Sequence, residues 1–159
     1  ASPLKAITSN SAATDQPLCG GYGTLQVGDL ALFRNGLWFL NISSTPTFSF
    51  GTGGEIAVHI GAKGFGNLTD RRNMIYGVYR AGTWFIDETG SGTATRTVNF
   101  GGLVQDVPLL IPSWNGNATY SLAIYRDGTW FIRPDVSGTS VVTVQFGAIG
   151  DIPLVRGAH

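Results

Sequence analysis

The sequence predicts an all-β fold built from repeats of one four-stranded unit. An Arg-x-Gly-x-Trp-Phe motif begins at Arg34, Arg80 and Arg126, so the repeats are 46 residues apart. A fixed period in the forties is typical of one supersecondary unit stacked on copies of itself. Glycine is abundant, at 23 of 159 residues, and only 13% of the residues are charged, as expected of short strands joined by tight turns.

Each motif lies in a predicted β-hairpin. The three hairpins are Leu32–Leu40, Val78–Ile86 and Ile124–Ile132, and their turns are Asn35-Gly36, Ala81-Gly82 and Asp127-Gly128. A two-residue type I′ turn needs positive φ at both positions, which Asn, Asp and Gly tolerate. The alanine makes the second turn a weaker example of the same signal.

A third strand follows each hairpin and ends in Phe-Gly. The three copies are Phe48–Gly51, Arg96–Gly101 and Val142–Gly147. In the last copy Val142, Val144 and Phe146 alternate with polar residues, which predicts a half-buried strand with these three side chains on one face.

The fourth element is an apolar strand with a proline near its start. Clear copies are Asp106–Leu110 and Asp151–Val155, a degenerate copy is Glu55–Ile60, and Ser2–Ala6 resembles a further copy. The chain therefore contains four of these strands but only three hairpins. An extra first strand is what strand exchange between the first and last units would require.

Four strands per unit predict a propeller-like fold with about three four-stranded blades, in one repeat domain spanning residues 1–159. The repeats cover about residues 3–55, 56–105 and 106–150, and a closing strand covers 151–155. Propellers usually have four to eight blades, so we expect either a fragment or a homo-oligomer that completes a ring, most simply a dimer with six blades. A β-trefoil, which also has three repeats of this length, is the alternative.

Charge and hydropathy argue against two classes of partner. The formal net charge is zero, and Arg71-Arg72 is the only dibasic pair, so the basic surface that holds a phosphate backbone is missing. No apolar run approaches the length of a membrane span. We expect neither nucleic-acid binding nor membrane insertion.

The third repeat resembles a known family. Its segments Ala123–Ile132, Phe146-Gly147 and Gly150–Leu154 are similar to the repeats of extracellular propellers of the FG-GAP and VCBS type. The resemblance covers roughly residues 26 to 155 and weakens from the third repeat to the first. It implies a bladed protein, secreted or at the cell surface, that takes part in adhesion or in glycan or protein recognition.

The chain departs from that family in its metal loops. Members usually carry an Asp-rich calcium loop, whereas the corresponding segments here are Gly66–Asn73 and Ser113–Tyr120. Calcium prefers six to eight oxygen ligands, several of them carboxylates, and the second segment has none. We expect no metal and no cofactor.

Catalytic signatures are weak. The two histidines are His59, in an apolar stretch, and His159, and no nucleophile and base are recognisable. Asp87-Glu88 with Asp106 could form a glycosidase-type carboxylate pair. Because Asp106 and Asp151 occupy equivalent repeat positions, a structural role is the better interpretation, and we expect no enzymatic activity.

Aromatic and amide side chains are the best candidates for ligand contact. The repeated tryptophans suit stacking on sugar rings, although they also suit packing between blades. Arginines of the hairpins can pair with Asp106 and Asp151 of neighbouring blades, or lie over the tryptophans, instead of binding a ligand. Trp114 has no copy in the other repeats. The predicted ligand-binding residues are Trp38, Trp84, Trp130, Arg80, Arg126, Trp114, Asn115 and Asn117.

Three sequons, at Asn41, Asn67 and Asn117, are possible glycosylation sites. The single cysteine, Cys19, excludes an intrachain disulfide; an unpaired buried thiol, an intermolecular bridge and a reactive site all stay open. The start without methionine suggests a processed or excised chain. We therefore expect a secreted or cell-surface, lectin-like module that binds glycan in clefts between blades. The alternative is a structural, adhesion or protein-interaction domain whose partner is a surface protein.

Overall fold

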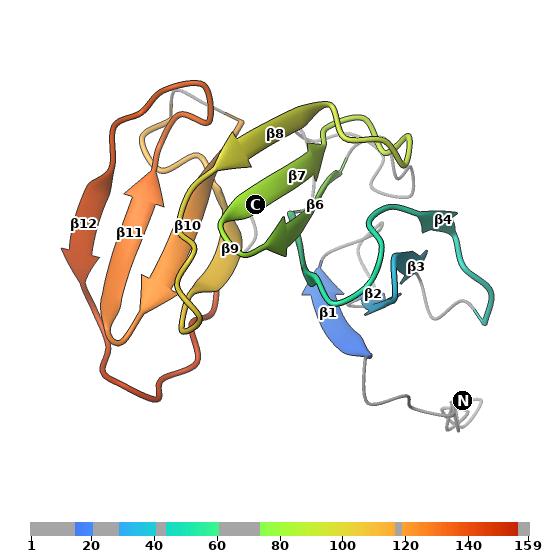
Figure 1. Ribbon diagram of the computed structural model, residues 1–159, viewed down its shortest axis with the longest axis horizontal. Coiled ribbons are helices and arrows are strands. Elements are labelled where there is room, and N and C mark those ends of the chain that lie inside the picture. The colour runs from blue at the N-terminus through green and yellow to red at the C-terminus, as the bar shows by residue number, and fades with distance from the viewer. Residues whose placement is uncertain (1–14, 21–28, 41–43, 61–73, 117–118, 156–159) are drawn as a thin grey trace.

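The computed structural model describes residues 15–20, 29–40, 44–60, 74–116 and 119–155, and these residues form three four-stranded antiparallel sheets (Figure 1). Sheet 1 contains β1 (Gln16–Gly20), β2 (Asp29–Arg34), β3 (Leu37–Phe39) and β4 (Phe48–Ser49). Sheet 2 contains β5 (Ile56–Ile60), β6 (Ile75–Arg80), β7 (Thr83–Asp87) and β8 (Arg96–Asn99). Sheet 3 contains β9 (Val107–Pro112), β10 (Tyr120–Arg126), β11 (Thr129–Arg133) and β12 (Val142–Gln145). Within each sheet the strands lie in chain order.

The second and third strands of every sheet form the predicted hairpin. The non-glycine turn residues have positive φ, at 48° for Asn35, 45° for Ala81 and 49° for Asp127. The following glycine is confined by the turn after the fourth strand: a Cβ on Gly36 would lie 2.6 Å from the Gly51 carbonyl oxygen. The turn chemistry predicted from the sequence is confirmed.

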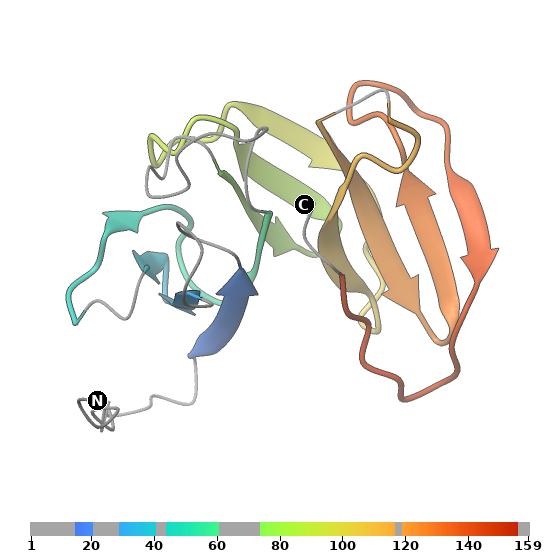
Figure 2. The same cartoon turned by 180° about the vertical axis from the view of Figure 1, so that it is seen from behind.

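The three sheets follow one another in a stack, as Figures 1 and 2 show from opposite sides. Their first strands lie next to one another, β1 beside β5 and β5 beside β9. The Gln16 side chain fixes the first of these contacts, because its Nε2 donates to the Glu55 carbonyl at 2.5 Å and its Oε1 accepts the Ala57 N–H at 2.9 Å.

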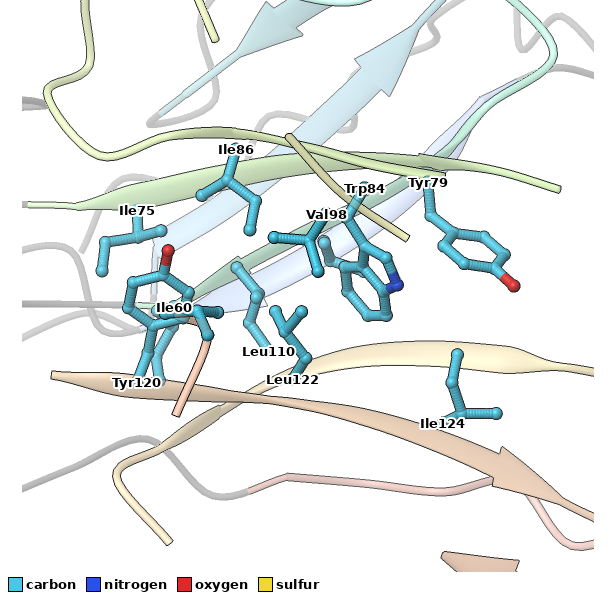
Figure 3. Close-up of a cluster of buried hydrophobic side chains, with 12 residues drawn as sticks. Ile60, Ile75, Tyr79, Trp84, Ile86, Val98, Leu110, Tyr120, Leu122 and Ile124 are labelled. Carbon is cyan, nitrogen blue, oxygen red and sulfur yellow. The ribbon is translucent and has the colours of Figure 1, made fainter. Parts of the chain in front are cut away.

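Apolar side chains fill the two spaces between the sheets. Between sheets 1 and 2 the buried residues include Phe33, Trp38, Phe48, Tyr76 and Val78. Between sheets 2 and 3 they include Ile75, Trp84, Ile86, Val98, Leu110, Leu122 and Ile124 (Figure 3). Sheet 2 therefore has one face toward sheet 1 and the other toward sheet 3, and both of its faces are buried.

The all-β repeat architecture agrees with the sequence prediction, but one strand does not. The first strand of sheet 1 is β1, with Pro17-Leu18 preceded by Asp15, rather than Ser2–Ala6, which lies outside the described residues. The sequence pattern does not predict β1, because Gln16 and Cys19 interrupt its apolar residues. Among the described residues no strand pairs with a strand of another repeat, as a trefoil barrel would require.

The predicted closing strand is not paired. Residues 151–155 are not part of any sheet in the described chain, and Ile152 and Leu154 are 83% and 85% exposed. No helix in the part of the chain that the structure describes is long and apolar enough to cross a membrane.

Candidate binding face

An acidic residue precedes the first strand of each sheet and binds the arginine of the hairpin in the same sheet. Arg34 Nε lies 2.5 Å from Asp15 Oδ1, and Arg126 Nε lies 2.6 Å from Asp106 Oδ1. Arg80 donates from its Nη2 to Glu55 Oε1. The pairing predicted between neighbouring blades is therefore wrong: the pairs form within each sheet.

These arginines lie over a phenylalanine of their own hairpin rather than over the repeated tryptophans. The guanidinium carbon is 5.5 Å from the ring centre of Phe39 in sheet 1, 5.8 Å from that of Phe85 in sheet 2, and 4.9 Å from that of Phe131 in sheet 3. Arg80 and Arg126, predicted to bind a ligand, thus already have an acidic and an aromatic partner.

The acid–arginine pair of sheet 3 is the most buried. Burial alone would raise the pKa of Asp106, but the hydrogen bond from Arg126 and the backbone N–H groups of Leu103 and Gly102 outweigh it and hold that pKa below its ordinary value. The side chain of Asp106 is 0% exposed. Its carboxylate therefore stays ionised and has a structural role.

The three repeated tryptophans are anchored identically but differ in exposure. Each indole Nε1 donates to a backbone carbonyl after the fourth strand, at 2.9 Å in Trp38, 2.8 Å in Trp84 and 2.9 Å in Trp130. Trp38 and Trp84 are 0% exposed because the next sheet covers them. In this arrangement a ligand cannot reach either ring, whereas Trp130 is partly exposed.

In the described part of the chain, sheet 3 has one face that no other sheet covers, and that face is hollowed. A groove of about 450 Å³ is lined almost wholly by apolar atoms of residues that include Ile111, Trp114, Trp130, Val144, Phe146 and Leu154. Phe146 is 74% exposed, whereas Phe50 at the same position of sheet 1 is 6% exposed. We call this face, with its groove, the open face of sheet 3.

Trp114 stands at the edge of the open face. It is 48% exposed, and its backbone N–H donates to Ser121 Oγ at 3.1 Å. Ser121 Oγ in turn donates to the Pro134 carbonyl at 2.9 Å, which fixes the segment that carries Trp114. Asn115 is exposed beside it, whereas Asn117 lies outside the described residues.

The remaining candidates have structural surroundings or lie outside the described residues. Asp87 accepts the backbone N–H groups of Thr89 and Gly92, so it organises its own turn. Tyr120 of sheet 3 donates to Glu88 of sheet 2 at 2.8 Å. Burial and this hydrogen bond raise the pKa of Tyr120. The sequons Asn41 and Asn67, together with His159, lie outside the described residues.

We call the acidic residue before the first strand of each sheet its first-strand acid. Asp151 has the same backbone surroundings as these acids but has no arginine partner among the described residues. Its Oδ2 accepts the Ala148 N–H at 2.9 Å, as Asp106 Oδ2 accepts the Leu103 N–H at 2.9 Å. In the described chain no arginine lies on Asp151, and no group of three or more His, Cys, Asp or Glu side chains is arranged to hold a metal.

Sequence reasoning found Trp114 and Trp130 but missed Asp15 and Glu55 as arginine partners. The signal was available for Asp15, since Asp15-Gln16-Pro17-Leu18 has the pattern of Asp151-Ile152-Pro153-Leu154. Comparisons of the chain with protein-family models, with curated proteins and with solved structures found no match.

Proposed function

We propose that this protein is a non-enzymatic protein-interaction module made of propeller-type blades that acts at the cell surface or outside the cell. The open face of sheet 3 is the observation that supports this function. Exposed apolar surfaces of this kind are typical of protein-binding sites.

The polar groups of the repeat support the same function, because they are used inside the chain. The arginines are paired with acids, and each repeated indole N–H is bonded to a carbonyl. The open face of sheet 3 is apolar instead, and such a surface suits a protein partner better than a charged or strongly hydrated one. The formal net charge of zero gives no support to nucleic-acid binding.

The arrangement of the three sheets supports the proposal of a propeller related to the FG-GAP and VCBS type. Each unit is a meander of four strands, and the first strands of successive sheets lie next to one another. Radial repetition of four-stranded sheets around first strands is the arrangement of propeller blades. We propose secretion on the basis of the same family resemblance.

Glycan binding is a second candidate, and Trp114 favours it. An exposed indole face beside the exposed amide of Asn115 can stack on a sugar ring and bond its hydroxyl groups. The site is limited to this edge, because Trp38 and Trp84 are covered.

One experiment separates the two candidates. The chain, Phe146→Asp and Trp114→Ala are passed over immobilised glycans, purified extracellular proteins and the chain itself. The interaction function predicts retention on a protein surface that Phe146→Asp abolishes. Retention on glycans alone, lost in Trp114→Ala, supports the lectin-like function instead, and retention that Phe146→Asp leaves unchanged contradicts the interaction function.

A further inference from the structure

Among the described residues, sheet 1 also has a face that no other sheet covers. Val78 and Ile124 point toward the preceding sheet and are each 1% exposed, whereas Leu32 at the same repeat position is only partly buried. Pro17 is exposed where its counterpart Ala57 is buried. Within the described residues, sheet 1 therefore has an uncovered backward face, the one that would meet a preceding sheet. Sheet 3 has an uncovered forward face, the one that would meet a following sheet.

One uncovered face is a backward face and the other is a forward face. Contacts between a forward and a backward face already occur twice within the chain. Forward faces of sheets 1 and 2 pack against backward faces of sheets 2 and 3. A backward face of sheet 1 in a second copy is thus chemically matched to the open face of sheet 3. Such head-to-tail contacts form rings when their rotation closes.

Residues 146–151 repeat the backbone path that leads into sheet 3. Phe146 N–H donates to the Gly128 carbonyl at 3.0 Å, as Phe100 N–H donates to the Gly82 carbonyl at 2.8 Å. The next turn is also repeated, because Asp151 N–H donates to the Ala148 carbonyl at 3.2 Å and Asp106 N–H donates to the Leu103 carbonyl at 3.1 Å. Residues 151–155 therefore follow the turn at Asp151 in the same way as β9 follows the turn at Asp106.

The two oxygens of a first-strand acid have separate duties. In Asp106, Oδ2 accepts turn N–H groups and Oδ1 accepts Arg126. In Glu55, Oε2 accepts the Thr52 N–H and Oε1 accepts Arg80. Asp151 Oδ2 already accepts its turn N–H, so the carboxylate is oriented for an arginine that none of the described residues supplies.

We propose that residues 151–155 add to β2 of a second copy as the first strand of its sheet 1, in place of β1, and that Asp151 pairs with Arg34 of that copy. This inference rests on the proposed interaction function and names its partner. The sheet so completed covers the open face of sheet 3 with Leu32 and its neighbours. Two copies that exchange these strands contain six sheets, within the range of propeller rings.

Residues 151–155 are better suited to that place in an assembly than β1. Both segments read Asp-x-Pro-Leu, so both match the register that puts an acid beside Arg34. The exchange gives up the two hydrogen bonds of Gln16 to sheet 2. In return it buries part of the surface of Ile152 and Leu154 together with the open face, which favours the exchange through the hydrophobic effect.

The test begins with the mass of the chain in solution, measured by sedimentation from nanomolar concentrations to about 100 µM, a range that covers tight and weak association. The proposal predicts a dimer or a larger closed assembly. The quenching of tryptophan fluorescence by acrylamide should fall as the chain associates, because Trp130 becomes covered while Trp38 and Trp84 are buried throughout. A chain that stays monomeric over the whole range overturns the proposal.

Two carboxylate variants test the strand assignment. Asp151→Asn should raise the dissociation constant at least tenfold, whereas Asp15→Asn should leave it unchanged or lower it, because Asp15 belongs to the competing strand. Val104→Asp is the control, since Val104 is fully exposed in a turn outside the open face. If Asp15→Asn weakens the dimer and Asp151→Asn does not, β1 remains the first strand of sheet 1 in the dimer. That result overturns the assignment.

A peptide makes the test independent of the folding of the variants. The octapeptide of residues 148–155 should dissociate the assembly, and the same peptide with asparagine at the position of Asp151 should be at least tenfold weaker. Equal potency of the two peptides, or no effect of either, overturns the proposal. If the chain stays monomeric but another protein retains it in a manner that depends on Phe146, the proposed function stands and this inference alone fails.

Discussion

Arg126 Nε donates to Asp106 Oδ1 across 2.6 Å, and this pair joins the hairpin of sheet 3 to the turn before its first strand. The Asp106 side chain is fully buried, and its other oxygen holds the backbone of Gly102 and Leu103. One carboxylate thus fixes the turn between sheets 2 and 3, the start of β9 and the end of β10.

Replacing that carboxylate should destabilise the whole chain. In Asp106→Asn the amide cannot accept from both sides, so a partly buried arginine and two turn N–H groups lose their charged partner. We expect the free energy of unfolding to fall by about 2–4 kcal/mol, measured by urea denaturation at concentrations where the chain is monomeric. Asp127→Asn is the matched control, because Asp127 is exposed at a turn where asparagine is equally suitable. Equal effects of the two variants would contradict the role of the pair.

The repeated tryptophans should differ in their contribution to stability although they occupy one position of the repeat. Trp84 is 0% exposed between sheets 2 and 3, so Trp84→Ala should lower the free energy of unfolding by about 3–5 kcal/mol. Trp130 lies on the open face, and Trp130→Ala should cost only about 1–2 kcal/mol in the monomer. Parallel urea titrations compare the two variants. If Trp130→Ala is as damaging as Trp84→Ala, the open face is covered within the monomer.

The difference between these tryptophans separates what the sequence predicts from what it does not. Turns such as Asn35-Gly36 are determined by neighbouring residues, so the hairpins and the all-β repeat were predictable. Exposure of Trp130 depends on whether another sheet follows, and a repeat motif contains no such information.

The prediction that the arginines pair between blades was wrong for a related reason. The spacing shows that Arg126 and Asp106 recur together, but it does not say whether they meet within a sheet or between sheets. That choice depends on the register of β10 with β9, in which Tyr125 lies opposite Val107 and brings the end of one strand to the start of the other. Register follows from packing of both faces, which local patterns do not specify.

The turn of sheet 2 holds a residue whose backbone conformation is unfavourable for its side chain. Ala81 has φ of 45°, in the left-handed region that costs an ordinary side chain about 1–2 kcal/mol. Asparagine occupies the equivalent position in sheet 1 with φ of 48°. Ala81→Asn should therefore raise the free energy of unfolding by about 0.5–1 kcal/mol, seen as a higher melting temperature in calorimetry. Gly82→Ala should have the opposite sign, because its Cβ would lie 2.9 Å from the Gly101 carbonyl oxygen. A loss of stability in Ala81→Asn would contradict this account of the turn.

His59 should make the fold sensitive to mild acid. Burial lowers the pKa of His59 from 6.5 to about 4, so between these pH values the unfolded chain binds a proton that the folded chain does not. The free energy of unfolding should therefore fall as the pH falls from 6.5 toward 4. The loss should not exceed about 3 kcal/mol, because the side chain is not fully buried and keeps some contact with water.

The carboxylates act in a lower pH range, which allows the two contributions to be separated. Asp106 and Asp87 have pKa values held below their ordinary ones, so their stabilisation is present above about pH 4 and is lost as the pH falls further. Urea titrations at several pH values should show both phases in the wild-type chain. His59→Gln should remove the slope between pH 6.5 and 4 and keep the loss below it. A slope that persists in this variant would assign the mild-acid phase to a group other than His59.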